Sequence, residues 1–350
     1  MVVPLIGRSA AAVVGALLVL TAWYSAVGTL IVPRSVSSWL TVWVDRIVHG
    51  TFRLVARAIA DYKRRDRVLA GEAATILLAQ LAAWLATSFV GFWLLLWPFE
   101  AGGAPSAIVT AAGATGLVIV TLQIAYLPSL YAAFNRRETE VALLNARAGV
   151  PSWGPELLAR THYALGSGVS TVDTLPDLYA RWEVWAADVA ESHSTYLPLV
   201  RFRSPRPLSS WVTALLAVLD SAALYLALSP KAAPTVPARL CLRAGFQCFN
   251  QIATAMGIQV PGEASPPSAI SLTYEEFLSG IDRMRKIDFP LERDPAEAWP
   301  DFVGWRANYE HAAYAVAADI YAVPALWSGP RRPPIPAIPP YRPPLGRPPK

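Results

Sequence analysis

Three long apolar runs without charged residues dominate the first 135 residues of the chain. They cover Ser9 to Pro33, Ala73 to Pro98 and Ala107 to Leu127. Each run is as long as the roughly 20 residues that an α-helix needs to cross a hydrocarbon core of about 30 Å. The pattern therefore predicts three transmembrane helices, over about residues 9–33, 73–98 and 105–127, within a membrane domain of residues 1–135.

Basic residues are distributed unevenly around these runs. Between the first and second runs lie Arg34, Arg46, Arg53, Arg57, Lys63, Arg64, Arg65 and Arg67, whereas the connection between the second and third runs has no basic residue. Because basic loops stay cytoplasmic, we expect the amino terminus outside and the chain after the third span inside. A cleaved signal peptide is the alternative for the first thirty residues. The first run is, however, longer than the apolar core of about 7–15 residues in such peptides.

The basic segment of residues 36–67 has the pattern of an amphipathic helix. Trp39, Val42, Trp43, Ile47 and Val48 recur at helical spacing, and Arg46, Arg53 and Arg57 are expected to share a different face. Such a helix is predicted to lie in the cytoplasmic headgroup layer, with its basic side chains attracted to anionic lipid. The candidate lipid-facing residues are Arg46, Arg53, Arg57, Lys63, Arg64 and Arg65. The alternative is a cytosolic helix that docks on the soluble domain.

A fourth apolar run, Leu208 to Leu228, has the length of a span but contains Asp220. A carboxylate at the centre of a transmembrane helix costs roughly 2.5 to 3.5 kcal/mol on the insertion scale. A span here would also export Lys231, Arg239 and Arg243. We therefore expect the run to form the buried central helix of a cytosolic domain, in which Asp220 has a hydrogen-bond partner. A fourth span is the alternative.

The remaining sequence predicts a cytosolic helical domain over residues 136–329, so the fold class is all-α. A stripe at helical spacing is formed by Leu175, Leu178, Trp182, Trp185 and Val189. Thr174 with Asp177, and Thr273 with Glu276, resemble amino-terminal caps. The third apolar helix is expected to continue past Pro128 to Ala148 and to end at Gly149.

The last segment, residues 330–350, is expected to be a disordered, basic, Pro-rich tail. It carries five basic residues and no acidic residue, which equals the net charge of +5 of the whole chain. The residues before the tail are therefore balanced in charge and give no reason to expect nucleic-acid binding. The tail is a candidate ligand for an aromatic groove or for anionic lipid, although a solubilising role is the simpler interpretation.

Residues for catalysis or metal binding are scarce. Asp188, Glu191 and His193 are close in sequence, but on one helix Asp188 and His193 are separated by about 140° and Glu191 and His193 by about 160°. Cys241 and Cys248 are about 10.5 Å apart along a helix axis, too far for a disulfide. The sequence has no nucleophile elbow, P-loop, dinucleotide fingerprint or zinc-protease motif. We therefore expect no enzymatic activity, no metal and no cofactor.

Three runs of sequence resemble a known group of membrane proteins. LQIAYLPSLYAAFNRRETEVALLNARAGVPSWGPELL, residues 122–158, resembles the segment after the pore of bacterial two-helix potassium-channel-like proteins. WEVWAADVAESHSTYLPLVRFRSPRPLSSWVTALLAVLDSAAL, residues 182–224, is similar to their cytosolic domain, and TAWYSAVGTLIVPR resembles their first span. The resemblance implies an ion-channel-class protein of the bacterial plasma (inner) membrane. It also implies a homo-oligomer or association with a related channel subunit, with the lipid bilayer as its surroundings.

The chain departs from that group where the selectivity filter should be. The connecting loop consists of Pro98, Phe99, Glu100, Ala101, Gly102, Gly103 and Ala104. Such a loop reaches at most about 24 Å when extended, and a pore helix with its carbonyl filter needs roughly 25 to 40 residues. We therefore expect a non-conducting or regulatory relative of an ion channel. The alternative is a membrane-anchored interaction protein that acts through its helical domain and Pro-rich tail. A transporter with Gln123 in its path is weaker, since a single intramembrane amide usually joins helices.

Overall fold

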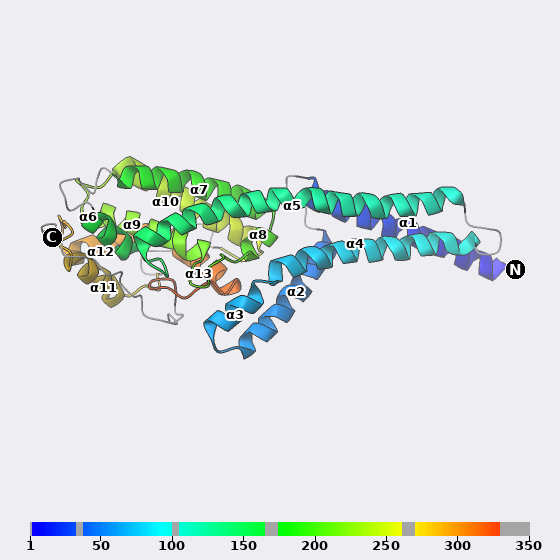
Figure 1. Cartoon of the computed structure of the whole chain (residues 1–350), viewed down its shortest axis with the longest axis horizontal. Coiled ribbons are helices and arrows are strands. Elements are labelled where there is room, and N and C mark those ends of the chain that lie inside the picture. The colour runs from blue at the N-terminus through cyan, green and yellow to red at the C-terminus, as the bar shows by residue number, and fades with distance from the viewer. Residues whose placement is uncertain (1, 33–37, 100–104, 165–173, 261–269, 330–350) are drawn as a thin grey trace, which may run out of the picture. The chain divides into compact units, whose positions relative to one another are not determined.

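The computed structural model describes residues 2–32, 38–99, 105–164, 174–260 and 270–329. Over these ranges all regular structure is helical and no strand is present (Figure 1). The predicted all-α class is therefore confirmed. The Pro-rich tail predicted for residues 330–350 lies outside the described residues.

The chain forms two compact units. Unit 1 comprises Met1–Asn135 and Ser192–Arg203, and unit 2 comprises Arg136–Glu191 and Ser204–Lys350. The sequence-based division placed residues 192–203 with the helical domain. They belong to unit 1 because Leu199 packs in a core cluster with Leu77 and Leu130.

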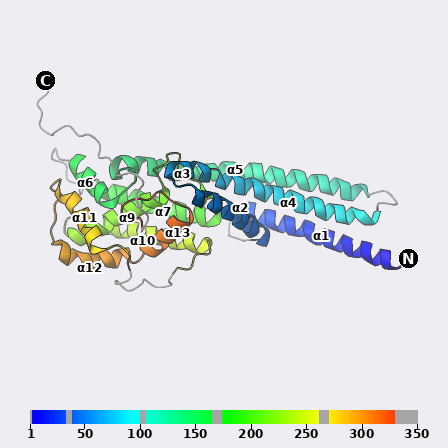
Figure 2. The same cartoon turned by 90° about the horizontal axis from the view of Figure 1, so that it is seen from below.

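Unit 1 contains three long helices and a short helical hairpin. Its elements are α1 (Val2–Leu30), α2 (Trp39–Ala58), α3 (Tyr62–Leu69), α4 (Glu72–Leu96), the 3₁₀ turn η1 (Trp97–Phe99), the first part of α5 (Ser106–Ala148), the last turn of α7 (Leu175–Thr195) and α8 (Pro198–Arg201). α1, α4 and the first part of α5 lie side by side in both views (Figure 1 and Figure 2). Helix α1 begins before the predicted span and includes Arg8, since a charge limits burial in lipid but does not end a helix.

Helices α1 and α4 pack backbone to backbone. A Cβ atom added at Gly15 would lie 2.5 Å from the Gly91 carbonyl oxygen, and one added at Gly91 would lie 2.9 Å from the Gly15 carbonyl oxygen. Only glycine at both positions allows this approach, because any side chain would displace the neighbouring backbone. Small residues at helix contacts of this kind are typical of membrane bundles.

Helix α5 contacts the other two through larger side chains. Ile119 packs with Trp84 and Ala26 in one buried cluster. The Trp23 indole donates a hydrogen bond to the Thr115 hydroxyl at 3.3 Å. The stripe of α5 that includes Thr115 and Ile119 therefore faces the bundle, and the remainder of this part of α5 is exposed.

Among the described residues, four helical stretches are long and apolar enough to cross a membrane: Gly7–Leu30, Tyr62–Phe99, Ser106–Ala148 and Trp211–Leu228. In the first three, only 22%, 33% and 17% of the apolar window is buried, so most of each window is not covered by protein. The fourth, α9 (Trp211–Leu228), is buried at every position. These helices fit a membrane location, and α9 differs from the other three because it has no surface left for lipid.

Unit 2 is built around α9. Its other elements are the last part of α5, α6 (Gly154–Ala164), most of α7, α10 (Thr235–Ala255), α11 (Tyr274–Arg285), α12 (Pro295–Arg306) and α13 (Glu310–Asp319). Helices α6, α10, α12 and α13 pack directly on α9. Glycines allow two of these helices to come close to α9: a Cβ atom at Gly154 of α6 would lie 2.7 Å from the Asp220 Cβ atom, and one at Gly245 of α10 would lie 2.4 Å from Leu219 Cδ2.

Most of the local sequence signals in unit 2 predict the helix faces and helix ends that the structure has. The predicted α7 stripe from Leu175 to Val189 is buried at every position, and Thr273 and Glu276 form the expected capping box. α5 ends at Ala148, before Gly149 with φ of +83°. Among the described residues, the buried hydroxyl of Thr174 has no hydrogen-bond partner, so its side chain does not form the predicted cap although α7 begins at the next residue.

Candidate functional site

The connection between α4 and α5 is short. Pro98 and Phe99 belong to η1, and α5 begins at Ser106. Glu100, Ala101, Gly102, Gly103 and Ala104 lie outside the described residues. Residues 100–105 separate η1 from α5.

The predicted apolar stripe of α2 is divided between two faces. Trp39, Trp43 and Ile47 are exposed, at 62%, 52% and 61%, whereas Val48 is buried. The residues that α2 buries face α4, on which the helix packs. The five apolar residues therefore do not share one environment: Val48 is covered by protein, whereas Trp39, Trp43 and Ile47 are not.

The six basic candidates occupy different environments. Arg46, Arg57, Lys63 and Arg64 are exposed, and Arg53 is half-buried. Arg65 donates hydrogen bonds from Nε and Nη2 to the Ile59 carbonyl oxygen, at 3.0 and 2.6 Å. Since Ile59 is the carboxy-terminal cap of α2, Arg65 fastens the turn between α2 and α3, and the four exposed residues are those available to a ligand.

The inner face of α2 carries an ionic cluster. His49 Nδ1 lies 2.6 Å from Glu72 Oε1, at the start of α4. Arg201 of α8 lies 3.2 Å from Asp45 and 3.5 Å from the same Glu72 oxygen. Two carboxylates, one arginine and one histidine thus meet in this cluster.

A second ion pair joins α3 to the same returning segment. Arg203 forms a short charge-assisted hydrogen bond with Asp66 and donates to the Tyr62 hydroxyl at 3.0 Å. Sequence reasoning missed both Arg201 and Arg203. A basic pair after Pro198 was visible, but nothing in the sequence relates it to acidic residues more than a hundred positions earlier. The cluster fixes residues 192–203 against α2, α3 and α4.

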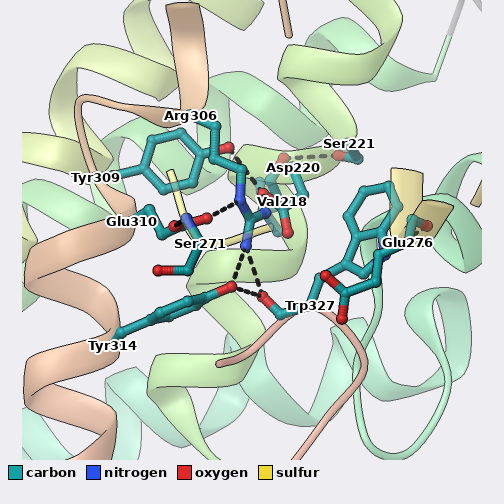
Figure 3. Close-up of polar contacts among 10 residues, drawn as sticks. All are labelled: Val218, Asp220, Ser221, Ser271, Glu276, Arg306, Tyr309, Glu310, Tyr314 and Trp327. Atoms are coloured by element: carbon teal, nitrogen blue, oxygen red, sulfur yellow. Dashed lines mark hydrogen bonds and ion pairs between the residues drawn. The ribbon is translucent and has the colours of Figure 1, made fainter. Parts of the chain in front are cut away.

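The most buried polar network lies in unit 2 and is centred on Arg306 (Figure 3). Its guanidinium Nε donates to Glu310 at 2.5 Å, and Nη1 donates to Asp220 in a short bond. Nη2 donates to the Tyr314 hydroxyl at 2.6 Å and to the Trp327 carbonyl oxygen at 2.7 Å. The Arg306 side chain is therefore engaged at all three nitrogens.

Asp220 receives a further hydrogen bond from Tyr309, at 2.8 Å. This confirms the prediction that the carboxylate of Asp220 has a partner within the fold. Burial acts to lower the pKa of Arg306, but the carboxylates of Asp220 and Glu310 outweigh it and raise that pKa well above the usual value. Arg306 is permanently charged, and its partners are all internal. The network therefore joins the helices of unit 2 to one another. Each Arg306 side-chain nitrogen already donates to an internal acceptor, so the network has a structural role.

The remaining candidates have structural roles. His193 is fully buried, and its Nδ1 lies 2.9 Å from the Ser192 hydroxyl. Asp188 pairs instead with Arg136, at 2.9 Å. Within the described ranges, no group of three His, Cys, Asp or Glu residues could hold a metal ion. Cys241 and Cys248 are buried free thiols, and burial raises the pKa of each, which disfavours the reactive thiolate.

Comparison with protein-family models, with curated proteins and with solved structures finds no match to this chain. The candidate site is therefore chosen on geometry alone. It is the exposed face of α2 that carries Trp39, Trp43 and Ile47, with the ionic cluster on the inner face of the same helix.

Proposed function

We propose that this chain is an integral membrane protein, anchored by α1, α4 and α5, that presents unit 2 on the cytoplasmic side as a non-enzymatic interaction module. The observation that carries the proposal is α5, a single helix of 43 residues. Its Ile119 and Leu130 are buried in unit 1, and its Val141 and Leu144 are buried in unit 2. One helix thus supplies core residues to both units.

Three spans, with α9 outside the bilayer, are part of this proposal. α9 has the composition of a span, but every one of its residues is buried by protein. Its Asp220 also forms an ion pair with Arg306, at the end of α12. Insertion of α9 would require unit 2 to come apart, whereas the outward sides of α1, α4 and α5 are already apolar, with exposed Leu20, Phe89 and Leu117.

The partner that we propose is a subunit of the ion-channel class, either a conducting relative or a second copy of this chain. Support comes from the sequence resemblance of residues 122–158 and 182–224, and the same resemblance suggests the bacterial plasma membrane. The spacing of η1 and α5 supports a role without conduction. A scaffold that recruits other partners through unit 2 and the Pro-rich tail is the alternative.

The test is purification in mild detergent, mass measurement, and flux in vesicles. We expect a membrane-extracted protein that gives no potassium-selective flux when reconstituted alone. Co-purification with a conducting subunit would support the first form of the proposal, and a monomer without such a partner would favour the scaffold. Potassium-over-sodium selective currents from the unmodified protein, free of host channels, would disprove the non-conducting assignment.

A further inference from the structure

Helix α2 has apolar side chains on two faces. One face is buried within unit 1, and the other is exposed. We call Trp39, Trp43, Ile47 and Leu54 the exposed stripe. At about 100° per residue they fall within an arc of about 80°, and their exposed fractions run from 52% to 70%. Exposed apolar stripes of this kind mark contact with another apolar phase or partner.

The position of α2 along the anchor identifies that phase. At its start, Ser38 Oγ lies 2.6 Å from Ser25 Oγ in α1, and Ser25 also accepts a hydrogen bond from the Trp84 indole at 2.8 Å. Eleven residues later, His49 meets Glu72. The first half of α2 therefore runs beside about 18 Å of α4, from Trp84 to Glu72. Its exposed stripe continues the lipid-facing surface of the anchor at the cytoplasmic end.

The charge beside the stripe identifies the lipid chemistry. On the helix wheel, Arg46 and Arg57 lie within about 20° of one edge of the arc. The Arg46 guanidinium carbon is 5.5 Å from the Trp43 ring centroid, so the cation is held over the ring that would enter the membrane. Lys63 and Arg64 add two exposed positive charges on α3. The acidic side chains of the hairpin have partners of their own: Asp45 pairs with Arg201, Asp66 pairs with Arg203, and the exposed Asp61 accepts a hydrogen bond from the Arg64 backbone N–H at the start of α3.

We propose that the α2–α3 hairpin is a binding surface for anionic lipid headgroups, with Trp39 and Trp43 inserted beside α4 and the exposed cations on the headgroup phosphates and carboxylates. The inference rests on the proposed insertion of α1, α4 and α5. Aromatic rings favour this depth, and each Lys or Arg near an anionic surface adds to the attraction. Because the ionic cluster ties α2 to residues 192–203, the bound hairpin holds the chain segment that leads into unit 2.

The test uses the full-length protein in nanodiscs of phosphatidylcholine, with or without phosphatidylserine. The variant Leu54→Cys carries an environment-sensitive dye, while the native Cys241 and Cys248 are buried. We expect quenching by brominated lipid to be several-fold stronger in the anionic discs and to fall at high salt. Neutralising four of the five exposed cations of the hairpin (Arg46→Gln, Arg57→Gln, Lys63→Gln, Arg64→Gln), with Arg67 left in place, should remove most of that difference.

A matched control removes four positive charges from the surface of unit 2. Its changes are Arg181→Gln, Lys231→Gln, Arg285→Gln and Lys286→Gln, all at exposed positions. This control should retain the anionic enhancement. Equal quenching in neutral and anionic discs would overturn headgroup recognition. Protection of the dye from both lipid and aqueous quenchers would show that protein covers the stripe. Extraction of the protein from membranes by alkaline carbonate would instead refute its anchoring by α1, α4 and α5. This measurement therefore distinguishes a failure of the proposed function from a failure of the lipid-binding inference.

Discussion

At the scale of single residues, buried charges are tolerated here because each is matched within the fold. Arg306 and Asp220 are both almost completely buried, a location that is costly for an isolated ion. Tyr309, Tyr314 and the Trp327 carbonyl oxygen complete the network. A buried ion pair is weak evidence for net stability, but its two halves depend on one another, so removal of one partner is the informative change.

Replacing Arg306 by Met should destabilise the protein by about 3 to 5 kcal/mol, because Asp220 and Glu310 would be left buried without their counter-ion. Urea unfolding of the purified protein in mild detergent, followed by near-ultraviolet circular dichroism, measures this loss. Arg285→Met is the control. Arg285 is exposed and makes a long ion pair of 3.8 Å with Asp282, so its loss should stay within about 0.5 kcal/mol. A loss below about 1 kcal/mol for Arg306→Met would contradict the central role of the network.

Glu156 should make unit 2 sensitive to acid. Burial acts to raise the pKa of Glu156, but Arg283 at 2.5 Å and Arg160 at 2.6 Å together lower it below the ordinary value of 4.5. A carboxylate with a depressed folded-state pKa contributes stability that is present above the unfolded pKa. That stability is lost as the pH falls through the folded pKa.

The comparison of unfolding free energies at about pH 5 and about pH 3 tests this sign. Glu156→Gln should be less stable than the unmodified protein at the higher pH, and the gap should narrow at the lower pH. Glu275→Gln, which changes an exposed carboxylate of α11, should leave the pH dependence unchanged. A gap that is constant or widens on acidification would show that the ion pairs of Glu156 do not set the acid response.

At the scale of elements, contact between helices is decided by which residues are small. α1 and α4 meet at Gly15 and Gly91, where a Cβ atom would collide with backbone. Gly113 of α5 has nothing within 4 Å of such an atom. Gly91 and Gly113 both lie in apolar helices, but Gly91 is tightly packed and Gly113 is open. Hydropathy alone does not distinguish them.

Gly91→Leu should destabilise unit 1 by about 1 to 3 kcal/mol, because the added side chain forces α1 and α4 apart. Gly113→Leu adds the same apolar volume to an open position and should be nearly neutral. The melting temperature of each variant in mild detergent is the measurement. Equal effects of the two substitutions would refute the close crossing of α1 and α4.

At the scale of the whole molecule, the proposed topology has three spans with unit 2 inside. Reporters fused after Arg67, Arg160 and Lys350 should all report cytoplasm, and a reporter inserted near Gly102 should report the outside. The physical reason is the basic charge between the first two spans, together with the Asp220–Arg306 pair that keeps α9 in unit 2. An external signal at Lys350 would make α9 a fourth span and would overturn this arrangement.

Much of the helical framework could be predicted from the sequence because its signals are local. The buried stripe of α7, the capping box at Thr273 and the end of α5 at Ala148 each depend on residues within a few turns of one another. The long uncharged runs likewise predict apolar helices by themselves. The hydroxyl of Thr174 shows the limit of such signals, because a capping residue type does not ensure a capping hydrogen bond.

The tertiary structure alone decided which partners those helices meet. α9 and α4 are similarly apolar, yet α9 is buried by protein on all sides and α4 is not, because α6, α10, α12 and α13 come from distant parts of the sequence to cover α9. The pairing of Asp220 with Arg306 spans 86 positions, and that of Asp45 with Arg201 spans 156. Periodicity along the chain carries no information about such pairs. The two apolar faces of α2 became distinct only once α4 covered one of them, which left the exposed stripe for another partner.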